Sequence, residues 1–344
     1  MNLASYTEHP LARLSAGRES MPPTTQDQTA ADFPSRFVYT PRQKLKRALG
    51  YVLYPLKNKF DRPRVETRLR AIGAQIDGGT AVNSMSWGHR GFAIEIFLKR
   101  IARIVGTGTM ETVVCFGCGS GAEMYTVARF LRPKRIIGYD FFNYKRAWDF
   151  VTVEVKARHN IQVEFRQLDL RNLIPNGAPR GDILLSFAVL EHLRDMDTTF
   201  EHLKPLVQNN GWFASQWGPM WYSYGGDHIA SELGFDAGFE HVALNSEEYF
   251  SFYKRHPRNA KSIQDSVPTW LELGLSNFAL YREYMSAIQK YFGPTRYLHW
   301  QLSPDAFEWR EKFPVKWSQL LQSNPHIQPL DLVLQGAAIL TSAR

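Results

Sequence analysis

Apolar and polar positions along residues 91–217 change repeatedly between a helical period and short continuous apolar runs. Gly91 to Val105 places its apolar residues on one helical face, and Thr112 to Phe116 is a short, β-branched run typical of a buried parallel strand. Further strands are expected over Arg135–Tyr139, Ile161–Leu168, Asp182–Phe187 and Trp212–Trp217, with helices between them over 122–131, 143–158 and 198–207. Strands that alternate with helices at this spacing predict a doubly wound, mostly parallel α/β sheet.

The alternation breaks after the fifth strand. Residues 218–295 read as an insertion that begins with a loop rich in glycine and aromatic residues, followed by helices near Ser246–Arg255 and Thr269–Tyr291. A strand at Arg296–Leu302, a helix around Val315–Gln322 and a last strand within 331–343 close the chain and bring the expected sheet to seven strands. The chain is therefore divided into a disordered tail (1–35), a basic extension (36–90), a ligand-binding core (91–217), a substrate-binding insertion (218–295) and the strands that complete the core sheet (296–344).

A glycine-rich turn, Gly117-Cys118-Gly119-Ser120-Gly121, joins the first strand of the core to a helix. Glycine lets a backbone turn tightly and approach a ligand closely, and the first amides of the helix favour a polar or anionic group at the same place. The next strand ends in Asp140, at a spacing suited to a ribose-binding acid. These residues predict a nucleoside-type site, for S-adenosylmethionine or a dinucleotide, and leave open a purely structural turn.

Composition narrows the class of protein. No apolar run is long enough to cross a membrane and the N-terminus lacks a secretory pattern, so a cytoplasmic protein is expected. The two cysteines, Cys115 and Cys118, form a C-x-x-C, for which small residues filling a tight turn is a better interpretation than a redox pair. No dense cluster of Asp, Glu and His suggests a metal site, so metal-independent chemistry is expected.

The net charge of +8 is concentrated near the N-terminus. Arg36 to Arg70 holds eleven basic residues and two acidic ones, and the rest of the chain is close to neutral. Within it an apolar stripe alternates with basic residues, as expected of an amphipathic helix that contacts an anionic membrane. Its apolar members are Leu45, Ala48, Leu49 and Val52, beside Lys44, Lys46 and Arg47. A cover for the cleft, a contact with an anionic substrate and a solvated cap helix stay open, while nucleic acid is not favoured because no known binding motif accompanies the charge.

Four segments, in order VVCFGCGSG, IIGYD, RQLDL and DILLSFAVLEHL, resemble the class I S-adenosylmethionine-dependent methyltransferases. The resemblance is closest to the small-molecule, type 11/12-like branch, whose fourth-strand motif ends in Leu-Glu-His-Leu. It implies a Rossmann-like fold closed by an antiparallel hairpin, here YLHWQLS and DLVLQGAAILTSA, and S-adenosylmethionine as the cofactor. An NAD(P)-dependent oxidoreductase is the alternative, although the Tyr-x-x-x-Lys pair of short-chain enzymes is absent.

The resemblance implies roles for individual residues. The backbone of the glycine turn would pass beneath the methionine part of the cofactor, Asp140 would accept from the ribose hydroxyls, and Asp169 would accept from the adenine amino group. The cofactor-binding residues implied in this way are Gly117, Cys118, Gly119, Gly121, Asp140, Phe141, Asp169, Leu170 and Phe187. One departure is Cys115, where the family commonly has an acid; Glu123 is the candidate to replace that acid.

For an oxygen acceptor on a small molecule or saccharide, a general base is expected, and histidine suits neutral pH. His192 follows the fourth strand and His228 lies in the loop after the fifth, with Glu191 able to orient His192 or to act itself. Aromatic side chains of that loop are expected to stack on the acceptor, or else to fold the loop: Trp221, Tyr222 and Tyr224. A scaffold without turnover and a nucleic-acid methyltransferase that uses Arg36–Arg70 are the remaining alternatives.

Overall fold

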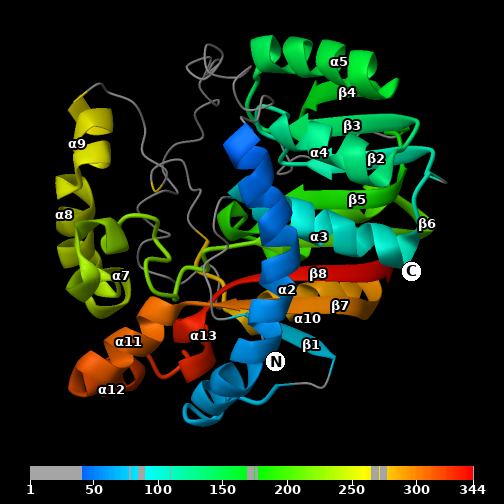
Figure 1. Ribbon diagram of the computed structural model, residues 1–344. Helices are drawn as coiled ribbons and strands as arrows, with labels where there is room; N and C mark the ends of the chain where they lie inside the picture. Colours follow the sequence, from blue (N-terminus) through cyan, green and yellow to red (C-terminus); the bar gives the residue numbers. More distant parts are fainter. Residues whose placement is uncertain are drawn as a thin grey trace.

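The computed structural model describes residues 41–76, 79–83, 90–108, 110–168, 174, 177–264, 271 and 277–343. Its centre is one eight-stranded sheet in the order β1-β7-β8-β6-β5-β2-β3-β4, with helices on both faces (Figure 1). All neighbouring strands run parallel except those that pair with β8, which is antiparallel to both β6 and β7. The predicted doubly wound, mostly parallel α/β fold is confirmed.

The five strands expected from apolar runs are present close to their predicted bounds. They are β2 (Thr112–Phe116), β3 (Arg135–Asp140), β4 (Gln162–Gln167), β5 (Gly181–Phe187) and β6 (Val207–Trp217). Successive side chains of a strand point to opposite faces of the sheet, so Val113 and Cys115 join one apolar cluster while Val114 and Phe116 join the other. Burial on both faces explains why these strands read as continuous apolar runs.

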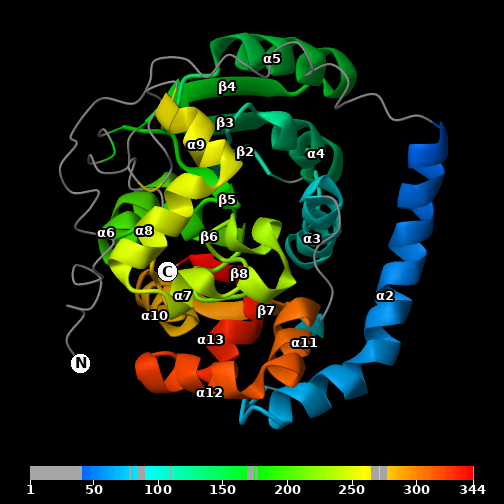
Figure 2. The same ribbon diagram turned by 90° about the vertical axis from the view of Figure 1, so that its left-hand side faces the viewer.

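Each face of the sheet has its own layer of helices (Figure 2). One layer holds α3 (Arg90–Val105), α4 (Ala122–Leu131) and α5 (Lys145–His159). The other holds α6 (Met196–Leu203), which continues as the 3-10 turn η4 (Lys204–Leu206), and α10 (Tyr281–Tyr291). Both layers are amphipathic; in α4, for example, Met124, Val127, Ala128 and Leu131 are buried.

The eighth strand was not predicted. β1 (Thr80–Asn83) lies within the segment interpreted as a basic extension, and it pairs in parallel with β7 (Phe292–Leu302). It has four residues, too few to show a period, and long-range pairing with Leu298 to Gln301 places it at the sheet edge. The extension therefore contributes to the sheet through β1 and carries the long helix α2 (Pro41–Arg70). The predicted tail, residues 1–35, lies outside the described residues.

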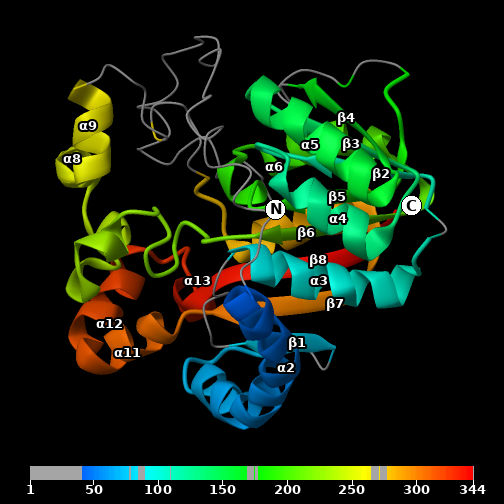
Figure 3. The ribbon, with the colours of Figure 1, turned by 45° about the horizontal axis from the view of Figure 1, so that its top comes forward.

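The insertion after β6 is built of short helices, and Figure 3 shows two of them standing away from the sheet. They are α8 (Ser246–Arg255), which matches its prediction, and α9 (Pro257–Gln264); η5 (Ala230–Leu233), η6 (Phe235–Ala237) and α7 (Glu240–Ala243) precede them. The helix expected over Thr269–Tyr291 begins only at Tyr281, and of residues 265–276 only Leu271 is described. Asn277 accounts for the later start, because its side chain accepts from Ala279 N (2.6 Å) and donates to Leu190 O (2.9 Å).

The last two strands pair antiparallel, as expected, and the helix expected around Val315–Gln322 lies between them. β7 is followed by α11 (Pro304–Lys312), α12 (Pro314–Ser323) and α13 (Pro329–Val333), and β8 is Leu334–Ala343. No helix in the described part of the chain is both long enough and apolar enough to pass through a bilayer.

Candidate active site

The glycine turn leaves β2 at the edge of the sheet where the parallel strands end. Gly117, Gly119 and Gly121 have φ values of 65°, 52° and 83°, in the left-handed region that favours glycine. Cys118 N donates to Tyr139 O (3.0 Å), and Trp148 Nε1 donates to Gly119 O (2.8 Å). The turn is thus fixed to β3 and α5 at the start of α4.

The three glycines differ in what surrounds them. A Cβ atom on Gly117 would lie 2.7 Å from Cγ1 of Val189 and closer still to its Cγ2, and one on Gly121 would lie 2.6 Å from Cζ of Phe165. A Cβ on Gly119 would meet no atom within 4 Å. Gly117 and Gly121 are therefore needed for packing, whereas the backbone at Gly119 faces open space in which a ligand can lie.

Asp140, at the end of β3, ties the glycine turn to the turn that follows β3. Its side chain is 7% exposed; Oδ2 accepts from Gly119 N (2.6 Å) and Oδ1 accepts from Phe142 N (2.9 Å). Burial raises the pKa of this carboxyl above its usual value, against the effect of the two backbone donors, and the charge of Glu123 adds to the rise. Each carboxylate oxygen keeps a lone pair for a ligand hydroxyl.

Both cysteines are buried as free thiols. Burial raises the pKa of Cys115 and of Cys118 far above the ordinary value, and the charge of Glu123 contributes to both. Thiols held in the protonated form are poor nucleophiles and poor redox groups. This supports the interpretation of the C-x-x-C as small residues in a tight turn. The effect of Glu123 on both thiols also indicates that its charge lies close to the turn.

Four buried polar atoms at the same edge have no hydrogen-bond partner among the described residues: Ser186 Oγ at the end of β5, Ser215 Oγ and Gln216 Oε1 at the end of β6, and Asn143 Oδ1 after β3. Ser186 and Ser215 are register partners. Buried polar atoms seldom lack a partner, but Gln216 directly follows Ser215 in β6 and so faces the opposite side of the sheet, which means that these atoms do not form one site. The open backbone at Gly119 and the Asp140 carboxylate fit a ligand with a ribose and an amino-acid part.

The two histidines predicted as alternative bases lie against each other. His192 ends η3 (Leu190–His192) after β5, His228 lies in the loop after β6, and their rings stack with centroids 5.5 Å apart and planes at 25°. Both are partly exposed, and His228 has a φ of 66°. Val189, which lies against Gly117, is the residue just before η3, so the chain enters η3 beside the glycine turn.

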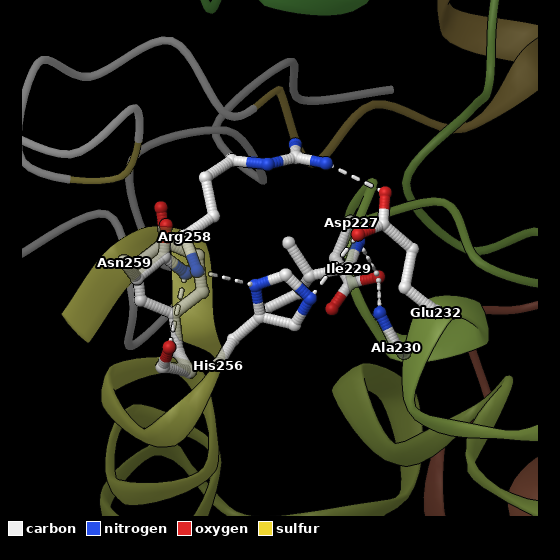
Figure 4. Close-up of polar contacts among 8 residues, drawn as sticks. Asp227, Ile229, Ala230, Glu232, His256, Arg258 and Asn259 are labelled. Carbon is white, nitrogen blue, oxygen red and sulfur yellow. Dashed lines mark hydrogen bonds and ion pairs between the residues drawn. The ribbon is translucent and has the colours of Figure 1, made fainter. Parts of the chain in front are cut away.

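Asp227 fixes the backbone beside His228. Its Oδ1 accepts from Ile229 N (3.2 Å) and Ala230 N (2.9 Å), as Figure 4 shows, and its Oδ2 accepts from Tyr249 OH (3.0 Å). The aspartate is 7% exposed and the tyrosine is fully buried. The sequence analysis missed both residues; the position of an Asp directly after Gly225-Gly226 was the available signal, because aspartate commonly closes such turns on its own backbone.

A second contact joins the same loop to the outlying helices. Glu232 in η5 lies 2.6 Å from Arg258 Nη2 and 3.2 Å from His256 Nε2 (Figure 4). His256 is 4% exposed, and its Nδ1 accepts from Arg258 N (3.4 Å). The loop that carries His228 is therefore held on one side through Asp227 and on the other through Glu232.

The three aromatic residues expected to stack on an acceptor are buried instead. Trp221, Tyr222 and Tyr224 are 4%, 6% and 5% exposed. Trp221 packs edge to face on Phe278, and Tyr224 OH donates to Phe235 O (2.9 Å). Burial, followed by nearby acidic charges, raises the pKa of Tyr224 to about 12. These contacts favour the alternative that the three side chains fold the loop.

Other predicted residues have different surroundings. Glu191 is 5% exposed. The pKa of Tyr284 in α10 is raised first by burial and second by the charge of Glu191, so the Glu191 carboxylate acts on the side of the sheet that α10 covers. Phe187 packs edge to face on Phe97 of α3. Phe141 is partly exposed beside Phe142. Asp169 and Leu170 lie outside the described residues. Within the described ranges, no group of three or more His, Cys, Asp or Glu side chains could hold a metal ion.

Comparison with known proteins adds one family. Residues 114–213 match the model of a family described as a methyltransferase domain. No curated protein matches the chain by sequence.

Solved structures resemble the chain at low identity. One is the YcgJ protein from Bacillus subtilis (10% identity, 72% of this chain and 98% of that one, TM-score 0.40). Others are geranyl diphosphate C-methyltransferase from Streptomyces coelicolor (14%, 72% and 78%, 0.41) and a sarcosine dimethylglycine methyltransferase from Galdieria sulphuraria (13%, 72% and 84%, 0.42).

Proposed function

Since the chain is an S-adenosylmethionine-dependent class I methyltransferase, we propose that it methylates an oxygen atom of a small-molecule or saccharide acceptor, with a histidine as the general base. The family match covers the glycine turn, Asp140 and the strand that leads to His192. It favours methyl transfer over the dinucleotide oxidoreductase alternative.

The stacked histidines carry the proposal. Two imidazoles from different loops meet, with 5.5 Å between their ring centroids. A neutral imidazole accepts a proton at one of its ring nitrogens, so the pair brings two candidate bases together.

When bound, S-adenosylmethionine would supply an activated methyl group for the acceptor oxygen, with S-adenosylhomocysteine as the leaving group. The proposed part of the protein is to orient the acceptor hydroxyl and to accept its proton at a ring nitrogen of His228 or His192. Such proton transfer contributes roughly 10²–10⁴-fold to rate. Asp227 would keep the backbone of His228 in place during the step.

For the cofactor, we propose that the backbone at Gly119 lies beneath the methionine part and that Asp140 accepts from the ribose hydroxyls. Glu123, whose charge already acts on Asp140, would face the cationic part of the ligand. Phe141, partly exposed next to Asp140, would pack on the adenine. The fit of this ligand is supported by the open space at Gly119.

The first test is calorimetric titration with S-adenosylhomocysteine, with NADH in parallel and Asp140→Ala as the control. Binding of S-adenosylhomocysteine that is lost in the variant supports the assignment. A preference for NADH, or binding that Asp140→Ala leaves unchanged, contradicts it.

The base is tested by screening hydroxyl acceptors for release of S-adenosylhomocysteine and comparing His228→Gln and His192→Gln. We expect at least one variant to lose roughly 10²-fold or more in kcat, with the pH dependence of the wild type removed and S-adenosylhomocysteine affinity retained. His159→Gln, at the end of α5, is the matched control. Full activity in both stacked-histidine variants would exclude histidine as the base.

A further inference from the structure

Helix α2 exposes an apolar face. The described chain has nine strongly exposed large apolar side chains, and five of them lie on this helix. They are Leu45 (62% exposed), Leu49 (49%), Leu53 (55%), Leu56 (48%) and Phe60 (78%). At 100° per residue their spacing confines them to an arc of about 80°, so they form one continuous outer stripe. Single exposed leucines need no explanation, but a row of five on one helix face does.

The way α2 docks leaves this stripe outside. Val65 and Leu69, at 2% and 0% exposure, lie on the opposite face of the helix and join the core. Arg68 packs over the ring of Phe307 in α11, 5.3 Å from its centroid, and Arg310 donates to Ala71 O (3.2 Å). Figure 2 shows α2 along the side of the molecule with its C-terminal end beside α11. Turning the stripe inward would require these contacts to break.

Cations accompany the stripe. Arg42, Lys59 and Arg64 are exposed, and their positions in the helix lie within or beside the same arc. None of the three forms an ion pair with a residue that the structure describes. The segment Arg36–Arg70 has a net charge of +9, from eleven basic and two acidic residues. A partner for this face must therefore take up leucine and phenylalanine side chains while carrying negative charge.

We propose that α2 is an interfacial helix that binds the surface of an anionic lipid bilayer, with the stripe from Leu45 to Phe60 inserted among the acyl chains. Long basic side chains beside such a stripe can reach the headgroups, and each contributes about fivefold to binding of an anionic surface. A second copy of the chain is a poorer occupant, because pairing two such helices would bring two segments of +9 together. The proposal is independent of the acceptor and the base.

The test is cosedimentation of the full chain with vesicles of phosphatidylcholine, with and without phosphatidylserine. We expect binding to the anionic vesicles, weaker binding to neutral ones, and a decrease with salt. The double variant Leu53→Asp, Leu56→Asp should bind the anionic vesicles at least tenfold more weakly. Its thermal melt and its affinity for S-adenosylhomocysteine should match those of the wild type, because both side chains are exposed.

The double variant Val153→Asp, Val315→Asp, on α5 and α12, is the matched control, since it adds the same two negative charges at valines that are 66% and 68% exposed. We expect it to bind vesicles as the wild type does. Absence of vesicle binding would overturn the proposal, and so would an equal loss in the control. A dimer in light scattering that the leucine double variant dissociates, without vesicle binding, would assign the stripe to a second copy instead.

Discussion

Replacing Gly117 and Gly119 by alanine, one at a time, separates a packing glycine from a ligand-contacting one. Both residues have a left-handed φ, so each substitution should cost about 1–2 kcal/mol in backbone strain. At Gly119 the new methyl group meets open space, and we expect the loss of stability to stop there. The same methyl would occupy the space proposed for the cofactor, so affinity for S-adenosylhomocysteine should fall at least tenfold.

At Gly117 the methyl group would overlap the side chain of Val189, at 2.7 Å from Cγ1. Overpacking of this kind typically costs about 1–3 kcal/mol. The expected total for Gly117→Ala is therefore about 2–5 kcal/mol. Adding Val189→Ala removes the overlapping atoms and should recover most of the overpacking cost.

The assay is urea unfolding of the two single glycine variants, Val189→Ala and the double variant, analysed as a double-mutant cycle. We expect a favourable coupling of about 1–3 kcal/mol between Gly117→Ala and Val189→Ala. The reasoning is refuted if Gly117→Ala is no more destabilising than Gly119→Ala, or if Val189→Ala restores nothing.

Three further predictions concern ionisation. Burial is the main cause of the raised pKa of Asp140, so the contribution of this group to stability is complete below pH 3.8 and is lost as the pH rises through the folded-state pKa. Ligand hydroxyls favour the ionised carboxylate, so the affinity for S-adenosylhomocysteine, measured by calorimetry, should fall as the pH is lowered. Asp140→Asn should bind weakly, with an affinity that does not depend on pH in this way. Burial lowers the pKa of His299 to about 4, so its stabilising effect is present above pH 6.5 and decreases, by at most about 3 kcal/mol, as the pH falls through 4. Urea unfolding at several pH values in this range should show the loss of stability in the wild type. The same dependence of the unfolding free energy on pH in His299→Gln would contradict the prediction. Cys115 and Cys118 should react with a thiol reagent only after unfolding, because both are buried with raised pKa values; rapid reaction of the native protein would revive the redox interpretation.

The fold was predictable where local sequence and tertiary burial agree. Runs such as Thr112–Phe116 are apolar on both faces because helices cover both sides of the sheet, so a short continuous run of β-branched residues locates them. β1 was not predictable, since four residues show no period and their position depends on pairing with Leu298 to Gln301. The start of α10 depends on how Asn277 bonds to the loop after β5, which is a contact distant in sequence.

The candidate site also combines features that local sequence indicates with features that depend on contacts distant in sequence. Gly119 and Asp140 could be chosen as candidates because a glycine turn and an acid at the end of a strand are local signals. His192 and His228 were each chosen from their place after a strand, but their stacking is decided by two loops meeting in space. Tyr224 reads the same in sequence whether its ring faces a substrate or the core, and only the packed structure shows that it is buried.

The position of β8 has a consequence for biosynthesis. β8 (residues 334–343) follows every other described strand along the chain, yet it lies inside the sheet between β6 and β7, and β1 pairs with the sheet through β7. On the ribosome, a nascent chain can assemble β2 to β6 while β1 and β7 still lack strand pairing with them. A premature stop codon before β8 would therefore leave β1 and β7 without strand pairing to the rest of the sheet, and we expect such a product to be degraded rather than to retain partial activity.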